Sequence, residues 1–104
     1  MQKVFVMYKL KPGVTMEQYK KFSAETDRPI TPHQPGVISF KVYEIKGRDK
    51  GDSPFDIVED VDVESWDAWN KCVASEGMKK VVEEWGKVGD ESSMTMIYGD
   101  EITD

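Results

Sequence analysis

The segment Lys3-Val4-Phe5-Val6-Met7-Tyr8-Lys9-Leu10 is the most informative part of the sequence, because it predicts a strand with apolar side chains on both faces. Successive side chains of a strand point to opposite sides of the sheet. One side receives Val4, Val6, Tyr8 and Leu10, and the other receives Phe5, Met7 and Lys9. Both sides of this strand are largely apolar, so we expect both to be covered.

A helix is predicted immediately after this strand and a Pro-Gly turn. Thr15 and Gln18 match a capping box, in which the two side chains and backbone amides bond reciprocally. Apolar residues then recur at helical spacing. We expect the helix to run from about Thr15 to Asp27 and to end there, because Pro29 and Pro32 follow.

The rest of the chain predicts three more strands and a second helical region. The strands cover residues 37–45, 55–63 and 94–102, and the helical region covers residues 65–85 with a break at 75–77. The order βαββαβ indicates a single ferredoxin-like α+β domain over residues 1–104, an antiparallel four-stranded sheet with its helices on one face.

Composition narrows the classes of partner. The 104 residues carry a formal net charge of −6, which disfavours nucleic acid and anionic membrane surfaces. No apolar run approaches the ~20 residues that span a bilayer, and the first residues lack a signal-peptide pattern. Cys72 is the single cysteine, so no intrachain disulfide forms. We therefore expect a cytoplasmic protein without a metal site.

The second face of the sheet predicts a homodimer. Two helices cover only one face, and Phe5 and Met7 in the first strand and Ile97 in the last are apolar on the other. A second copy packed sheet against sheet is the simplest cover, and twofold pairing is the commonest symmetry. We expect a small-molecule cavity between the two copies. The alternative is a monomer with an exposed apolar face.

Five segments carry a resemblance to a known family: residues 4–14, 25–29, 35–37, 40–43 and 55–59. Nearly the whole chain resembles the dimeric α/β-barrel superfamily, and most closely the REDY-like small proteins of the HapK type. The resemblance implies two ferredoxin-like subunits forming a barrel, no cofactor, and a role in secondary metabolism near pigment and natural-product biosynthesis. Arg28 stands where the family's motif would place Tyr. The histidines of the polyketide-cyclase branch are missing, and His33 is poorly placed to bind heme.

Four residues are candidate catalytic groups. His33 follows the first helix closely, and an Asp27–His33 pair would be a general base; the alternative is an exposed loop histidine. Asp56 shares with Val58 the strand face turned away from the helices, where burial would raise its pKa; the alternative is a solvated strand edge. Tyr8 would donate a hydrogen bond to a ligand carbonyl, or pack as ordinary core.

Aromatic, aliphatic and thioether side chains are the candidate binding residues. They could wall an aromatic pocket, or simply form the core and anchor the helices. The set is Val4, Val6, Tyr43, Val58, Trp66, Trp69, Trp85, Met94 and Met96.

Three functions remain open on these grounds. The first is a cofactor-free enzyme that isomerises, cyclises or cleaves an aromatic or polyketide-like metabolite by moving a proton. The second is a non-catalytic carrier that uses the same pocket. The third is a cofactor-free monooxygenase, whose product would depend on oxygen.

Overall fold

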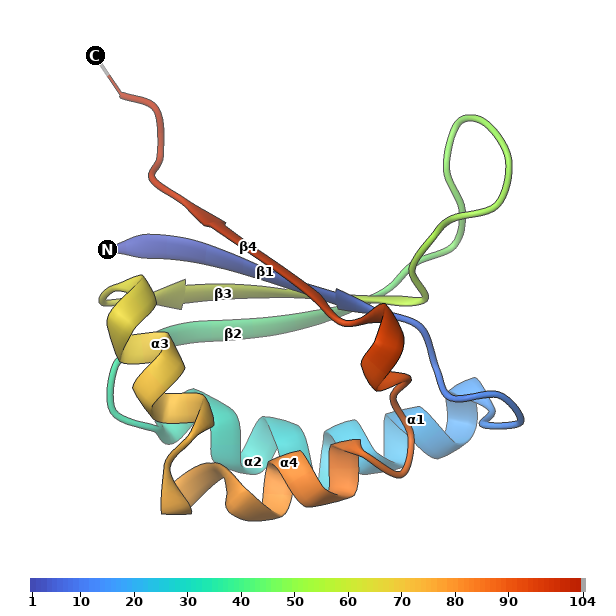
Figure 1. Ribbon diagram of the computed structural model, residues 1–104, viewed down its shortest axis with the longest axis horizontal. Coiled ribbons are helices and arrows are strands. Elements are labelled where there is room, and N and C mark those ends of the chain that lie inside the picture. The colour runs from blue at the N-terminus through green and yellow to red at the C-terminus, as the bar shows by residue number, and fades with distance from the viewer. Residues whose placement is uncertain (104) are drawn as a thin grey trace.

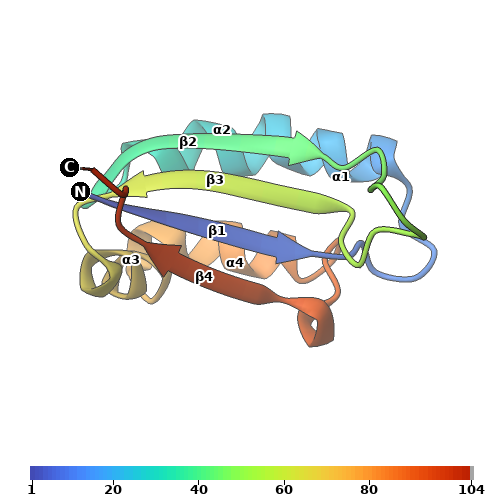
Figure 2. The ribbon, with the colours of Figure 1, turned by 90° about the horizontal axis from the view of Figure 1, so that it is seen from above.

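The computed structural model describes residues 1–103 as a four-stranded sheet with all of its helices on one face (Figure 1). The sheet order is β2-β3-β1-β4, and every neighbouring pair is antiparallel. The strands are β1 (Gln2–Tyr8), β2 (Val37–Glu44), β3 (Ile57–Val63) and β4 (Thr95–Gly99). The predicted ferredoxin-like α+β arrangement is confirmed. The view onto the sheet shows its strands uncovered, with the helices behind them (Figure 2).

The first helix begins where the sequence predicts and continues beyond its predicted end. The Thr15–Gln18 capping box is present, with Gln18 N donating to Thr15 Oγ1 over 3.2 Å. The helical path then includes α1 (Met16–Phe22), the π-helix η1 (Ser23–Asp27), α2 (Arg28–Ile30) and the 3-10 helix η2 (Thr31–His33). Each proline lies in the first turn of a new segment. A missing amide is tolerated there, so neither proline ends the path.

The second helical region breaks at Ser75, as predicted. Ser65 caps α3 (Trp66–Val73) by accepting from Ala68 N over 3.0 Å. The 3-10 turn η3 (Glu76–Met78) leads into α4 (Lys79–Trp85), and η4 (Glu91–Ser93) precedes the last strand. None of the helices described between residues 1 and 103 is long and apolar enough to cross a membrane.

Alternation along β1 and β3 separates a helix-facing side from an open side. Val4, Val6 and Tyr8 are buried under the helices, together with four residues of β3: Ile57, Glu59, Val61 and Val63. On the open side, cross-strand pairing aligns Phe5 with Asp60 and Ile97, and Met7 with Val58 and Thr95. The predicted faces of β1 are therefore confirmed.

A register irregularity interrupts the alternation at the start of β2. Strict alternation would place Val37 and Ser39 on one face, but Val37 pairs with Val63 and Ser39 with Asp62. An extra residue in one strand moves the preceding side chains to the other face. Val37 consequently packs against the core.

Candidate functional site

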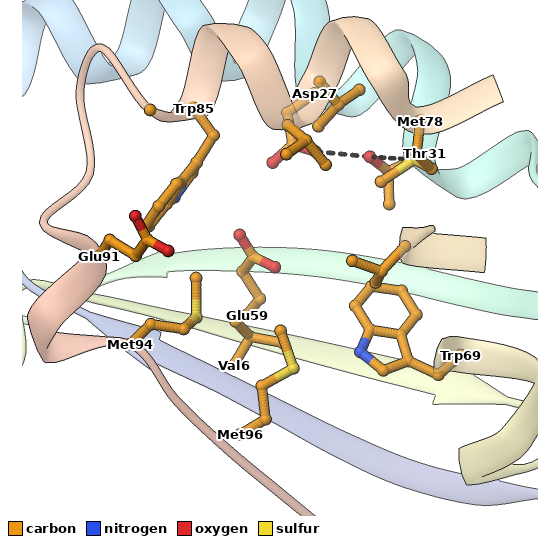
Figure 3. A pocket seen from close by; sticks show the side chains of 14 residues that line it. Val6, Asp27, Thr31, Glu59, Trp69, Met78, Trp85, Glu91, Met94 and Met96 are labelled. Atoms are coloured by element: carbon orange, nitrogen blue, oxygen red, sulfur yellow. Dashed lines mark hydrogen bonds between the residues drawn. The ribbon is translucent and has the colours of Figure 1, made fainter. Parts of the chain in front are cut away.

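A cavity of about 290 Å³ lies between the sheet and the helices of one chain (Figure 3). The sheet contributes Val6, Glu59 and Met96, and η1 contributes Asp27. The other lining residues are Thr31, Trp69, Val73, Met78, Val81, Val82, Trp85, Gly86, Glu91 and Met94. The lining is mostly apolar, and carboxyl groups are its main polar feature. Its volume lies near the lower end of the range usual for small-molecule sites, ~300–1,000 Å³.

Glu59 projects into this cavity from the middle of β3. Its side chain is 7% exposed, and its Oε2 accepts a 2.6 Å hydrogen bond from the Tyr8 hydroxyl. The Tyr8 hydroxyl is also 2.6 Å from that of Tyr19, on α1. Burial raises the pKa of Glu59 to about 8, the charge of Asp27 adds to the rise, and the Tyr8 hydrogen bond opposes it. Burial likewise raises the pKa of Tyr8 and of Tyr19, so both phenols stay protonated.

Asp27 enters the cavity from the opposite wall, at the end of the π-helix. It is 3% exposed, and its Oδ1 accepts a 2.6 Å hydrogen bond from Thr31 Oγ1. Burial raises its pKa to about 6, while the Thr31 hydrogen bond and the charge of Arg28 oppose the rise. π-helical turns inside helices often occur at functional sites. Here the turn brings a carboxyl group to the inner face of the helical layer.

The two carboxyl groups point toward one another across the cavity (Figure 3). No lysine, arginine or histidine among residues 1–103 lines it. Ionisation of one carboxyl therefore makes ionisation of the other more costly, as it does for any pair of like charges in a poorly solvated site. The arrangement can hold one carboxylate and one carboxylic acid together near neutrality.

Two indole N–H groups beside the cavity have no hydrogen-bond partner. Among the described residues, the only buried side-chain nitrogen or oxygen atoms left unpaired are Trp69 Nε1 and Trp85 Nε1. Trp69 comes from α3 and is 3% exposed. Trp85 contacts Tyr8 edge to face, with ring centroids 5.1 Å apart, and packs closely on Gly89. Buried donors are usually paired, so each unpaired one needs an explanation.

Six of the residues predicted from the sequence line this cavity: Val6, Asp27, Trp69, Trp85, Met94 and Met96. Tyr8 lies directly beneath it, bonded to Glu59. The cavity therefore lies within one chain, on the helix-facing side of the sheet. We had expected a cavity on the other side, between two copies.

The other predicted residues lie elsewhere. His33 is exposed in η2, and the bonded partner of Asp27 is Thr31. Asp56 is half-buried, and its Oδ2 accepts from the Leu10 amide over 2.8 Å, which fixes the chain after β1. Val4 is fully buried in the core, and Trp66 stacks on Tyr98 with ring centroids 4.4 Å apart. Tyr43 pairs with Val58 on the open side.

Glu59 is the residue that sequence reasoning missed. It occupies an inward position of β3, between Ile57 and Val61, which are its apolar neighbours on the same face of that strand. A charged residue at such a position is almost never fully buried without a partner or a function. That exception to the alternation was the available signal.

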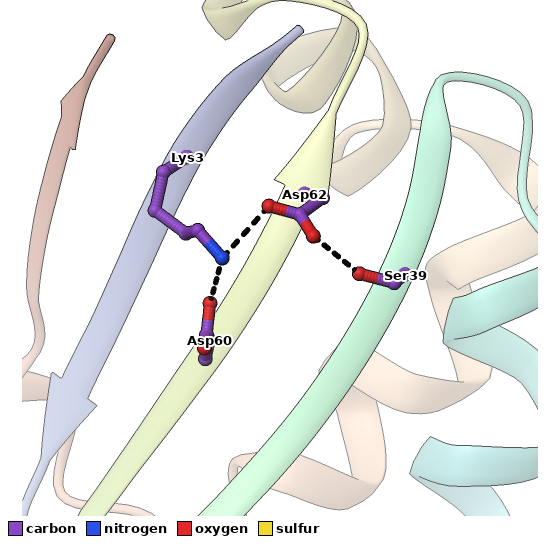
Figure 4. A network of polar contacts seen from close by, with 4 residues as sticks. All are labelled: Lys3, Ser39, Asp60 and Asp62. Atoms are coloured by element: carbon purple, nitrogen blue, oxygen red, sulfur yellow. Dashed lines mark hydrogen bonds and ion pairs between the residues drawn. The ribbon is translucent and has the colours of Figure 1, made fainter. Parts of the chain in front are cut away.

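The open side carries different chemistry. Lys3 Nζ lies 2.7 Å from Asp60 Oδ1 and 2.8 Å from Asp62 Oδ1, and Ser39 donates to Asp62 over 2.7 Å (Figure 4). A hollow of about 560 Å³ lies beside this cluster, between Phe5, Ile97 and the residues after β4, and none of the predicted site residues lines it. Among residues 1–103, no three His, Cys, Asp or Glu side chains are grouped to hold a metal ion.

Comparison with known proteins supports the fold and the family. The structure of HapK from Hahella chejuensis is similar at a TM-score of 0.79 and 13% identity, covering 100% of this chain and 95% of that one. An ethyl tert-butyl ether d (ethd) family protein from Bacillus halodurans matches at 0.75 and 20% identity, covering 98% and 99%. A dimeric protein of unknown function with a ferredoxin-like fold, from Bacteroides fragilis, matches at 0.70 and 11% identity, covering 96% and 95%.

At these identities the structural likeness establishes the fold alone. A search of curated proteins found no match. The family comparison is more specific, because it covers almost the whole sequence. Residues 2–102 match the family described as REDY-like protein HapK, and the chain therefore belongs to that family.

Proposed function

We propose that this chain is a small-molecule-binding enzyme that transfers a proton inside its internal cavity without a cofactor. One observation carries the proposal: two buried carboxyl groups share an apolar cavity, and their pKa values lie on either side of neutrality, at about 6 for Asp27 and about 8 for Glu59. At pH 7 Asp27 is then mostly ionised and Glu59 mostly protonated. General acid–base catalysis requires such a combination of acceptor and donor.

The reaction proceeds by two proton movements that balance. The Asp27 carboxylate removes a proton from an acidic C–H group of the ligand, and the electron pair of that bond moves into the ligand. The Glu59 carboxylic acid donates its proton to the ligand atom that receives the charge. Return of the first proton to a different carbon, and of the second to Glu59, completes an isomerisation with no net proton consumed. The same steps can trigger ring closure or loss of a leaving group.

The surroundings support these two roles. Tyr8 and Tyr19 lie beneath Glu59, and their hydroxyl chain fixes Oε2, so Oε1 is the atom left to meet a ligand. Thr31 holds one oxygen of Asp27, and Arg28 is the cationic group that influences it. Glu91, which is exposed, lines the cavity from η4. Among the described residues, no cationic side chain lines the cavity that the two acids share.

Proton exchange tests the proposal without knowledge of the natural substrate. Small aromatic compounds with an acidic C–H group are incubated with the protein in D₂O, and loss of the C–H signal is followed by proton NMR. We expect exchange faster than in buffer, with a bell-shaped pH dependence whose limbs lie near pH 6 and pH 8.

Two variants and a control assign the roles. Asp27→Asn should abolish the accelerated exchange and Glu59→Gln should reduce it, each by ~100-fold or more. Asp60→Asn is the control. Asp60 is the residue after Glu59 in β3, but its side chain lies on the open side, so the substitution should leave the exchange rate unchanged. If compounds bind in the cavity and none exchanges, the proposal fails, and the protein is a carrier.

We also propose that the open side of the sheet pairs with a second copy. Ile97 is 52% exposed and Tyr43 is 49% exposed on this side, with Phe5, Met7 and Val58 half-buried between them. The loop between β2 and β3 and the segment after β4 rise on the same side, as a rim around the sheet (Figure 1). Structural neighbours from Bacteroides fragilis and Thermobifida fusca are described as dimeric.

Mass measurement decides the pairing. Light scattering during size-exclusion chromatography should give twice the mass of the 11.9 kDa chain. Ile97→Glu should give the single-chain mass, because a charge would be buried in the contact. A single-chain mass for the unaltered protein at micromolar concentration would refute the dimer but not the internal cavity.

A further inference from the structure

The unpaired indole of Trp69 indicates the kind of atom that the cavity is built to hold. Its ring is 3% exposed, and Nε1 has no hydrogen-bond partner among the described residues. Figure 3 shows the nitrogen on the side of the ring turned toward Glu59 and Met96. An indole N–H only donates. A ligand that places an oxygen acceptor there would complete the site.

Glu59 adds a second donor next to the same space. Its Oε2 accepts from Tyr8, whereas its Oε1 has no hydrogen-bond partner among the described residues, and the Glu59 side chain lines the cavity. The pKa of about 8 keeps this carboxyl protonated at neutral pH. A carbonyl oxygen has two lone pairs and can accept from both donors.

The charge of the cavity limits what else the ligand can carry. Its lining includes Asp27, Glu59 and Glu91 but no cationic side chain. An anionic ligand would bring further negative charge into a poorly solvated space that already raises the pKa of its own acids. A cationic ligand would be attracted to Asp27 but would leave the Trp69 N–H unpaired.

The walls favour a flat molecule. Trp85 and Trp69 stand at opposite ends of the cavity, with Met94, Met96 and Val6 between them (Figure 3). Aromatic rings and thioethers pack well against conjugated systems and adapt to their outline.

We infer that the cavity binds an uncharged, conjugated carbonyl compound whose oxygen accepts hydrogen bonds from Trp69 Nε1 and Glu59 Oε1. This inference rests on the proposed function only in placing the ligand in the same cavity. It adds the chemical class of the ligand and names Trp69 as the residue that selects this class. Trp69 is a positioning residue for the ligand oxygen and takes no proton.

Four compounds of one shape test the inference by binding alone. They are 2-acetylnaphthalene, 2-ethylnaphthalene, 2-naphthoate and 2-(aminomethyl)naphthalene, which present a carbonyl, no polar group, an anion and a cation. Dissociation constants are measured at pH 7 by calorimetry with the full chain. We expect the ketone to bind about tenfold more tightly than the hydrocarbon and more tightly than either ion.

Trp69→Phe should remove the tenfold advantage of the ketone over the hydrocarbon while leaving hydrocarbon binding within about twofold. Trp66→Phe is the matched control, because Trp66 stacks on Tyr98 outside the cavity, and it should preserve the advantage. Circular dichroism confirms that both variants fold.

Three results would overturn the inference: tightest binding by the carboxylate or the amine, an unchanged ketone advantage in Trp69→Phe, or no binding by any of the four. These outcomes are separate from failure of the proposed function. Selective ketone binding without proton exchange would refute catalysis and keep the ligand class.

Discussion

Glu59 and Asp60 are neighbours in β3, yet their carboxyl groups lie in opposite environments. Glu59 points under the helices, where burial and the charge of Asp27 raise its pKa and the Tyr8 hydroxyl donates to it. Asp60 points to the open side, where Lys3 binds it over 2.7 Å and water reaches it. The same contrast holds two residues further on for Asp62, whose pKa is lowered by its hydrogen bonds to Lys3 and Ser39.

The pleat of one strand can therefore place neighbouring carboxyl groups in two chemical roles. On the open side a cation and solvent favour the charged form, so the acids contribute to solubility or to an interface. On the helix-facing side burial without a cation favours the neutral form, which prepares a carboxyl to donate a proton. This contrast between the two sides of β3 can be tested by substitutions on each side.

The largest effect concerns the dependence of stability on pH. Glu59 has a folded pKa of about 8 against an ordinary value of 4.5, so between these values the folded chain holds a proton that the unfolded chain has lost. The free energy of unfolding should therefore fall as pH rises from 5 to 8, by on the order of 4 kcal/mol. Glu59→Gln should flatten this slope and be more stable than the unaltered protein at pH 8. Urea unfolding at pH 5 and at pH 8 measures the free energy of unfolding of both proteins.

Asp62→Asn tests a carboxyl group whose effect on the pH dependence of stability has the opposite sign. Its folded pKa is lowered, so its contribution is present at pH 8 and is lost as pH falls. The variant should be slightly less stable than the unaltered protein at pH 8. If Glu59→Gln leaves the slope unchanged, the carboxyl is not held neutral by the fold.

The second effect concerns the hydroxyl that holds Glu59. Tyr8→Phe removes the donor to Glu59 Oε2 and the partner of the Tyr19 hydroxyl. We expect it to reduce the free energy of unfolding by about 1–3 kcal/mol and to raise the pKa of Glu59 further, because that bond favours the ionised carboxyl. Denaturant unfolding and carbon NMR of the labelled carboxyl measure these changes. Tyr43→Phe, on the open side, should cost less than about 0.5 kcal/mol.

The third effect concerns Gly89, which has no side chain and so leaves space for the Trp85 indole. A Cβ at Gly89 would overlap the Trp85 indole, whereas a Cβ at Gly99, opposite Lys3 on the open side, would meet nothing. Gly89→Ala should therefore cost about 1–2 kcal/mol and shift the tryptophan fluorescence. Gly99→Ala should do neither. Equal behaviour of the two variants would contradict the packing of the cavity's end wall.

The smallest effect concerns the ion pairs of the open side. Lys3→Met removes the cation from Asp60 and Asp62. In a single chain these groups are solvated, so there we expect only a slight loss of stability at low salt, and none at high salt, because counterions screen exposed pairs. Thermal unfolding at two salt concentrations measures it. A loss that persisted at high salt would show that the cluster is buried, as it would be in a dimer contact.

The fold could be predicted well from the sequence because local patterns encode it. Alternation located the strands, and capping at Thr15 and Ser65 located the helix starts. The continuation of the first helix past Pro29 and Pro32 could not be predicted. It depends on the π-helix, after which a new helical segment begins with Pro29 in its first turn. The irregularity beside Val37 also depends on pairing with β3.

The candidate site was predicted only in part, for a related reason. Side-chain periodicity is a property of the strand alone, so it was enough to predict the βαββαβ order, the apolar residues on both faces of β1 and the acidic residues of β3. Asp27 and Glu59 are 32 positions apart in the printed sequence, and they meet across one cavity only because the helices pack on the sheet. Burial raises the pKa of both groups, and the charge of Asp27 raises the pKa of Glu59 further; neither cause exists until the helices pack on the sheet.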